Sequence, residues 1–78
     1  MPRPISSIAA EISRSWANVN YAARPYLDAM HSLNSIHDTY FADSAMSVVL
    51  YFLSNANSWR GPEARRIKAE LNNLIKGA

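Results

Sequence analysis

The sequence predicts an all-α protein, a compact four-helix bundle whose third helix is central and nearly all apolar. Two observations favour this fold class. Apolar residues recur every three or four positions through most of the chain, and the four segments with this spacing are joined by short linkers. With 78 residues, the chain is expected to form one helical domain over residues 1–78. A domain of this size buries only about 60–65% of the surface that its unfolded chain exposes, so we expect modest stability.

The first helix is expected to follow an extended Met1–Pro4 segment, with Pro4 opening the helix because its φ angle is already helical. Its end is predicted near Asn18 or Asn20. The residues that recur at helical spacing, and should form its buried stripe, are Ile5, Ile8, Ala9, Ile12, Trp16 and Val19.

The second helix is predicted within Tyr21–Leu33. Its regular part should begin around Ala22 to Arg24, because the ring of Pro25 would clash with the carbonyl of the residue four positions earlier. The nine residues Asn34–Ala42 mix turn formers with larger side chains, which predicts a connector containing a short helical turn. Its apolar side chains are expected to fold back on the core: Ile36, Tyr40 and Phe41.

The third helix is predicted over Asp43–Asn55, which holds the longest apolar run, Val48–Leu53. A short apolar run is also compatible with a buried strand. A helix is favoured because the less apolar residues recur at helical spacing and do not alternate: Ser44, Ser47, Tyr51, Ser54 and Asn55. Asp43 is the predicted N-cap. Tyr51 is expected to bury its ring and hydrogen-bond through its hydroxyl.

The last helix carries the clearest start signal, Gly61-Pro62-Glu63, with glycine as N-cap, proline at the first helical position and an acid in the first turn. Arg66 and Glu70 are expected to pair at i,i+4 spacing, and Gly77 to end the helix. The predicted buried stripe consists of Ala64, Ile67, Leu71, Leu74 and Ile75.

Composition excludes several classes of function. The chain has no cysteine, which excludes disulfides, zinc–thiolate sites and thiol nucleophiles and fits a reducing cytoplasm. No apolar stretch approaches the roughly 20 residues of a membrane helix, and Met1–Ala10 is too polar for a signal peptide. A cytoplasmic protein without a membrane partner is therefore expected. The net charge of +2 does not by itself indicate nucleic acid, and it argues against a DNA mimic.

Nothing in the sequence predicts an enzyme or a cofactor. The only histidines, His31 and His37, match no metal-binding spacing even with Asp28 and Asp38 nearby, so we interpret them as surface or hydrogen-bonded residues. The chain has no nucleophile elbow, Walker loop or dinucleotide glycine pattern.

Basic residues are concentrated in the last quarter of the chain, which is its strongest functional asymmetry. Arg65, Lys68, Asn72 and Lys76 fall close to one line along the last helix, a pattern that fits phosphates, an acidic protein surface or a merely solvated face. Trp59 fits either an interface anchor or a core residue at a helix corner. The candidate partner-binding residues are Trp59, Arg60, Arg65, Arg66, Lys68 and Lys76.

Five short segments carry a family resemblance: Pro2–Ile8, Pro25–Leu27, Tyr51–Leu53, Trp59–Gly61 and Ala64–Lys68. Over nearly its full length the chain resembles small proteins carried by bacterial conjugative plasmids, integrative elements and phages. The resemblance implies a mobile-element origin and assigns no functional residue. It favours either an inhibitor of a host defence system such as CRISPR or an accessory protein of element transfer and maintenance.

The function predicted from these observations is stoichiometric binding to another macromolecule, with occlusion of a CRISPR-type defence effector as the specific hypothesis. A nucleic-acid-binding or regulatory module that uses the basic last helix is the alternative. A structural protein that forms a homo-oligomer is the third possibility.

Overall fold

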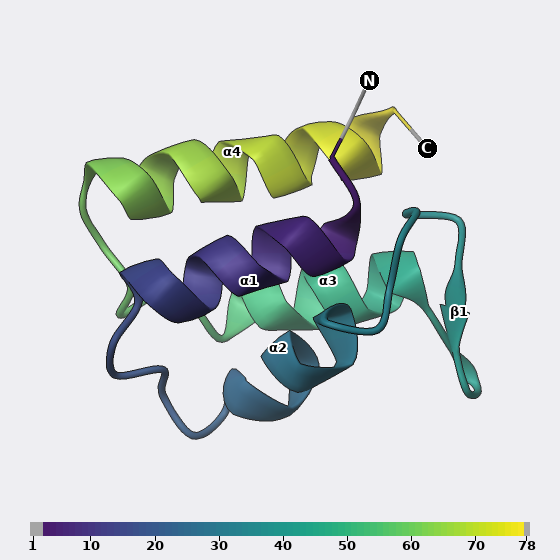
Figure 1. The fold of residues 1–78 in the computed structure, drawn as a ribbon, viewed down its shortest axis with the longest axis horizontal. Helices are drawn as coiled ribbons and strands as arrows, with labels where there is room; N and C mark the ends of the chain where they lie inside the picture. The colour runs from purple at the N-terminus through teal and green to yellow at the C-terminus, as the bar shows by residue number, and fades with distance from the viewer. Residues whose placement is uncertain (1–2, 78) are drawn as a thin grey trace.

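A computed structural model describes residues 3–77, and within this range the chain is mostly helical (Figure 1). A two-stranded hairpin accompanies the helices. In chain order the elements are α1 (Ile5–Ser15), α2 (Arg24–Met30), β1 (Thr39–Tyr40), β2 (Asp43–Ser44), α3 (Ala45–Ser54) and α4 (Pro62–Lys76). The mostly helical character agrees with the sequence prediction, whereas the hairpin was not predicted. The extended segment expected at Met1 and Pro2 lies outside the described residues.

The helices enclose one apolar core, to which α1 contributes Ile5, Ile8 and Ile12. In Figure 1, α4 runs along one side of α1, and α2 and α3 lie on the other side. The N-terminal turn of α1 is capped from a distance, because the amides of Ile5 and Ser6 donate to the carbonyls of Asn34 and Leu33 at 2.8 and 2.7 Å. The segment after α2 therefore anchors the start of α1.

The end of α1 differs from the sequence prediction, whereas the start of α2 agrees with it. α1 stops at Ser15 and not near Asn18 or Asn20, although Trp16 is still buried against the core. The side chain of Asn20 accepts the amide of Ala23 at 2.8 Å and donates to the carbonyl of Asn55 at 2.8 Å, which holds the chain in a loop. α2 begins at Arg24, within the predicted range.

The structure of α3 corrects three predictions. The N-cap is Ser44 and not Asp43, and its hydroxyl accepts the amide of Ser47 at 3.1 Å. Asp43 lies one residue too early to cap the helix because it pairs with Tyr40 in the antiparallel hairpin. The helix is also not buried on nearly all sides, since Leu50 and Tyr51 are 45% and 53% exposed. The ring of Tyr51 was expected to be buried, but it stacks on the ring of Tyr26 at the surface.

The connector between α2 and α3 folds back only in part. Ile36 is buried, but Phe41 is 90% exposed at the turn of the hairpin, with a positive φ of 55°. In place of the expected helical turn, the connector forms a hydrogen-bonded turn. In this turn the Asp38 carboxylate accepts hydrogen bonds from the amides of Asn34 and Ser35 at 2.9 and 3.0 Å. These two bonds lower the pKa of Asp38.

α4 begins as predicted, with Gly61 as N-cap and Pro62 at the first helical position. Gly61 has a φ of 111°, a conformation that side chains rarely adopt and that explains glycine at this position. The predicted stripe faces the core, with Ala64, Ile67 and Leu71 buried. Within residues 3–77, no helix combines the length and apolar character needed to cross a membrane.

Candidate functional site

The ends of three elements meet at an aromatic cluster beside the start of α4. The indole rings of Trp16 and Trp59 stack with centroids 5.3 Å apart and planes 7° apart. Phe52 of α3 meets Trp16 and Trp59 edge-on at 6.2 and 6.5 Å. Trp59 is only 4% exposed, so it belongs to the core and not to the surface as an anchor. The cluster gives the residues that follow Trp59 a rigid support.

Lys68 ties α4 to this cluster. Its ammonium group donates to the backbone carbonyls of Ala56 and Trp59, both at 2.7 Å, and lies 5.9 Å from the centroid of the Trp59 ring. Burial lowers the pKa of Lys68, and the positive charge of Arg60 lowers it further. The ammonium group is thus a fixed part of the site and not a mobile surface charge.

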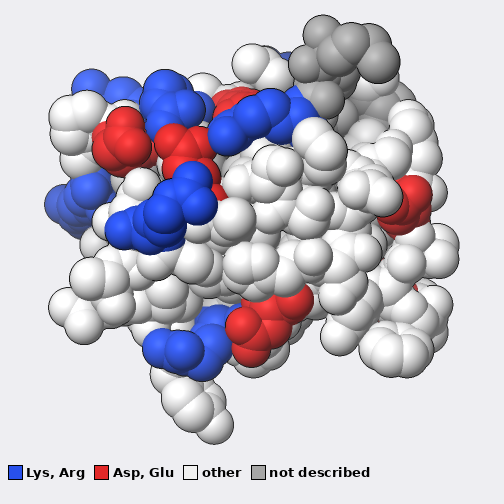
Figure 2. All heavy atoms as spheres, viewed as in Figure 1, with Lys and Arg blue, Asp and Glu red and all other residues white. Residues whose placement is uncertain are grey.

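A shallow pocket of about 270 Å³ opens over this corner, and its wall is rich in cations. We call it the basic corner, and it is lined by Trp59, Arg60, Gly61, Ala64, Arg65 and Lys68. Lys and Arg side chains gather on the side of the molecule where α4 begins (Figure 2). Arg60 and Arg65 are exposed, and within the described residues neither forms an ion pair.

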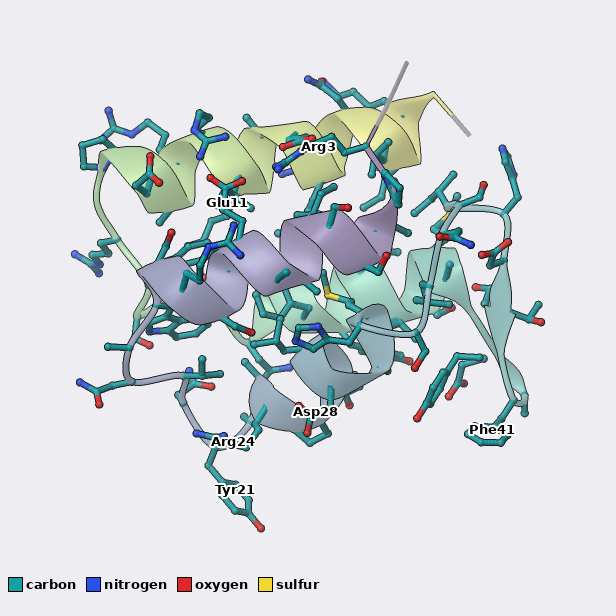
Figure 3. All side chains as sticks on the ribbon, viewed as in Figure 1. Arg3, Glu11, Tyr21, Arg24, Asp28 and Phe41 are labelled. Carbon is teal, nitrogen blue, oxygen red and sulfur yellow. The ribbon has the colours of Figure 1, made fainter. Side chains whose placement is uncertain are left out.

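A separate ion-pair network joins α1 to α4 and neutralises Arg3 and Arg66. Glu11 bonds to both Arg3, at 2.8 Å, and Arg66, and it lies between the two helices in Figure 3. Arg3 also pairs with Glu70 at 2.7 Å, and Arg66 with Glu63 at 3.4 Å. The prediction that Arg66 pairs with Glu70 is therefore wrong. Glu70 is taken by Arg3 because the packing of α1 on α4 brings them together.

The two ion pairs of Glu11 also shift the pKa of its carboxyl group. Arg66 and, to a smaller degree, Arg3 lower the pKa of the Glu11 carboxyl. Because the network contains two arginines and three glutamates, it offers no uncompensated positive charge to a partner.

The structure brings together four of the six predicted partner-binding residues, which line the basic corner: Trp59, Arg60, Arg65 and Lys68. Arg66 belongs to the ion-pair network, and Lys76 is the last residue of α4, at the opposite end of the helix from the corner. The predicted line of cations along α4 is interrupted, because the Lys68 side chain folds back onto the loop carbonyls and Asn72 donates to the Lys68 carbonyl at 2.9 Å.

The two histidines do not form a site with the neighbouring aspartates. His31 lies with its Nε2 atom 3.1 Å from the Ser13 hydroxyl, and His37 is exposed. Among residues 3–77, no three acidic or histidine side chains are grouped closely enough to hold a metal ion. A pocket of about 410 Å³, lined partly by Arg3, Ile36 and His37, lies between the start of α1 and the end of α4. No feature of the sequence predicted this pocket.

The chemistry available at the basic corner is recognition of anions. Among residues 3–77 the guanidinium groups of Arg60 and Arg65 have no carboxylate partner, and each supplies several N–H donors in a geometry suited to carboxylates and phosphates. Comparisons of the chain with protein-family models, curated proteins and solved structures found no match.

Proposed function

We propose that this chain is a small binding protein that docks stoichiometrically on an acidic surface of another protein through its basic corner. The observation that carries the proposal is the contrast between two sets of arginines. Arg3 and Arg66 are neutralised by glutamates, whereas Arg60 and Arg65 line one pocket together and have no acidic partner in the described residues.

The electrostatics of the corner favour an acidic partner. Arg60 lies close enough to Lys68 to lower its pKa, so the folded chain holds like charges near one another. Carboxylates of a partner would remove this repulsion and could bind each guanidinium through two parallel hydrogen bonds. The stacked Trp16 and Trp59 rings hold the corner in place, which reduces the conformational entropy lost on binding.

The proposed partner is a bacterial defence effector of the CRISPR type, blocked by occlusion in the cytoplasm. Support for this specific target is the resemblance to proteins of bacterial mobile elements, which favours anti-defence roles. Occlusion requires surface and no catalytic residue. A standard interface covers about 800 Å² on each partner. The chain exposes 4865 Å², so such an interface would occupy a modest part of it.

Nucleic-acid binding is the second candidate, favoured by the position of Arg60 and Arg65 beside the N-terminus of α4, where helix amides attract phosphates. Two observations make it the weaker one. The corner contains few free cations for phosphate contacts, and the buried Trp59 ring is not available for stacking on a base.

A tagged pull-down from bacterial lysate, with and without nuclease at moderate salt, tests the proposal. Near-stoichiometric capture of one protein complex that survives nuclease would support it and would identify the target. Capture of nucleic acid alone, lost with nuclease or salt, would overturn it in favour of the second candidate. Recovery of the chain's own oligomer alone would overturn both.

A further inference from the structure

The outer face of α3 is an exposed surface without charge. No residue of α3 is charged, and the chain has no lysine or arginine between Arg24 and Arg60. We call this surface the neutral face, and it consists of Ser47, Leu50, Tyr51 and Ser54 of α3 with Tyr26 of α2. The Tyr26 and Tyr51 rings stack with centroids 5.4 Å apart, which extends the face from α3 onto α2.

An exposed aromatic residue stands on the hairpin that packs against α3. Phe41 lies at the tip of the hairpin and meets the ring of Tyr40 edge-on at 4.8 Å (Figure 3). Its positive φ is an uncommon and costly backbone conformation for a bulky residue. The fold therefore presents this ring at the surface without burying it.

We propose that the neutral face is a self-association surface, on which α3 packs against α3 of a second copy about a two-fold axis. In a two-fold contact the same surface of both copies is used, and a residue on the axis meets its own copy, so charges on the axis would meet like charges. The neutral face has none, in contrast to the α1–α4 side of the same molecule. Because two copies of an uncharged face meet without repulsion, we propose a second copy of the chain as the partner of this face.

The shape and size of the neutral face agree with weak packing against a second copy of the chain. Ser47 and Ser54 are small and lie one turn to either side of Leu50 and Tyr51, so the larger side chains of one copy have room beside the serines of the other. Leu50 and Tyr51, which are 45% and 53% exposed, form the centre of the face, so the contact would be smaller than the standard protein interface of about 800 Å² per partner. A dimer that dissociates in the micromolar range is expected.

The dimer would carry two basic corners. None of the residues that line the corner belongs to the neutral face, so association leaves Arg60 and Arg65 exposed in both copies. A partner with repeated acidic surfaces would then be bound at two points, which raises the apparent affinity without any new contact.

Sedimentation velocity of the purified full chain, from about 1 to about 500 μM, tests the dimer. The mass should rise from the 8.7 kDa of one chain toward twice that value. Leu50→Glu and Tyr51→Glu should each shift the midpoint of association at least tenfold to higher concentration, because the axis then brings like charges together. Ser7→Glu, an equal charge change on the exposed side of α1, is the control and should associate as the wild type does.

Two results would overturn the proposal. One is a wild-type chain that keeps the mass of a single copy at every concentration. The other is wild-type association in both Leu50→Glu and Tyr51→Glu, with helical circular dichroism unchanged. Two variants are used because Tyr51→Glu also removes the stack on Tyr26, whereas Leu50→Glu leaves both rings in place.

Discussion

The ammonium group of Lys68 donates a 2.7 Å hydrogen bond to the backbone carbonyl of Trp59, across the junction between the α3–α4 loop and α4. A second bond of the same length to Ala56 closes the loop from the other side. The contact connects the stability of the fold with the proposed binding site, because the loop that carries Arg60 is held in place by a residue that also lines the basic corner.

Lys68→Met should destabilise the protein by about 1–3 kcal/mol, the usual range for losing hydrogen bonds from a charged donor. Methionine keeps the aliphatic packing of the lysine stem but leaves two loop carbonyls without this donor. The free energy of unfolding in urea measures the loss. Lys76→Met, which removes an exposed cation from the last turn of the same helix, is the control and should change stability by less than about 1 kcal/mol. Equal effects of the two variants would contradict the structural role of Lys68.

Arg60→Gln should raise the pKa of Lys68 toward its ordinary value. The variant removes the smaller of the two causes that lower this pKa, while burial, the larger cause, stays in place. Titration of the Lys68 side chain by NMR measures the change, and Arg24→Gln on α2 serves as the control. An unchanged pKa in Arg60→Gln would show that the two charges do not interact.

Trp59→Ala should cost about 3–5 kcal/mol, the range for removing a large aromatic side chain from a core. The reason is the loss of its stack on Trp16 and its edge contact with Phe52. Small domains have only about 5–15 kcal/mol of stability, so thermal unfolding should shift to much lower temperature. Trp59→Phe keeps an aromatic ring at the position and should cost clearly less. A Trp59→Ala variant as stable as the wild type would contradict the burial of this side chain.

Stability should fall in acid partly through Glu11. Its folded-state pKa is lowered, so its contribution is fully present above the unfolded pKa near 4.5 and is lost as pH falls through the folded pKa. Glu11→Gln should flatten the pH dependence of the melting temperature in this window. Glu63→Gln, which removes one longer contact to Arg66, should flatten it less. The opposite order would contradict the central position of Glu11 in the network.

Local signals explain what the sequence could predict of the fold. The start of α4 follows from Gly61-Pro62-Glu63, and the start of α2 from Pro25, because caps and proline act within one turn. The hairpin gave no such signal. Its turn lacks the glycine or asparagine that is typical of two-residue hairpin loops, and its strands are only two residues long. The N-cap of α3 was misplaced by one residue for the same reason.

Contacts between distant parts of the chain explain what was missed at the site. Composition alone indicated the basic end of the chain, and four of its predicted residues do line one pocket. Arg66 could not be separated from them, because its partner Glu11 is 55 positions away in sequence. The engagement of Lys68 with two loop carbonyls likewise depends on how the α3–α4 loop turns back on α4.

The most direct test of the proposed function compares capture of the partner from lysate by the wild type and by Arg60→Glu/Arg65→Glu, quantified by mass spectrometry. Arg24→Glu/Lys76→Glu, with the same change of charge away from the corner, is the matched control. We predict that the corner variant captures at least tenfold less partner protein than the wild type does, whereas the control captures the same amount as the wild type. Equal capture by both variants, with helical circular dichroism intact, would contradict binding through the basic corner.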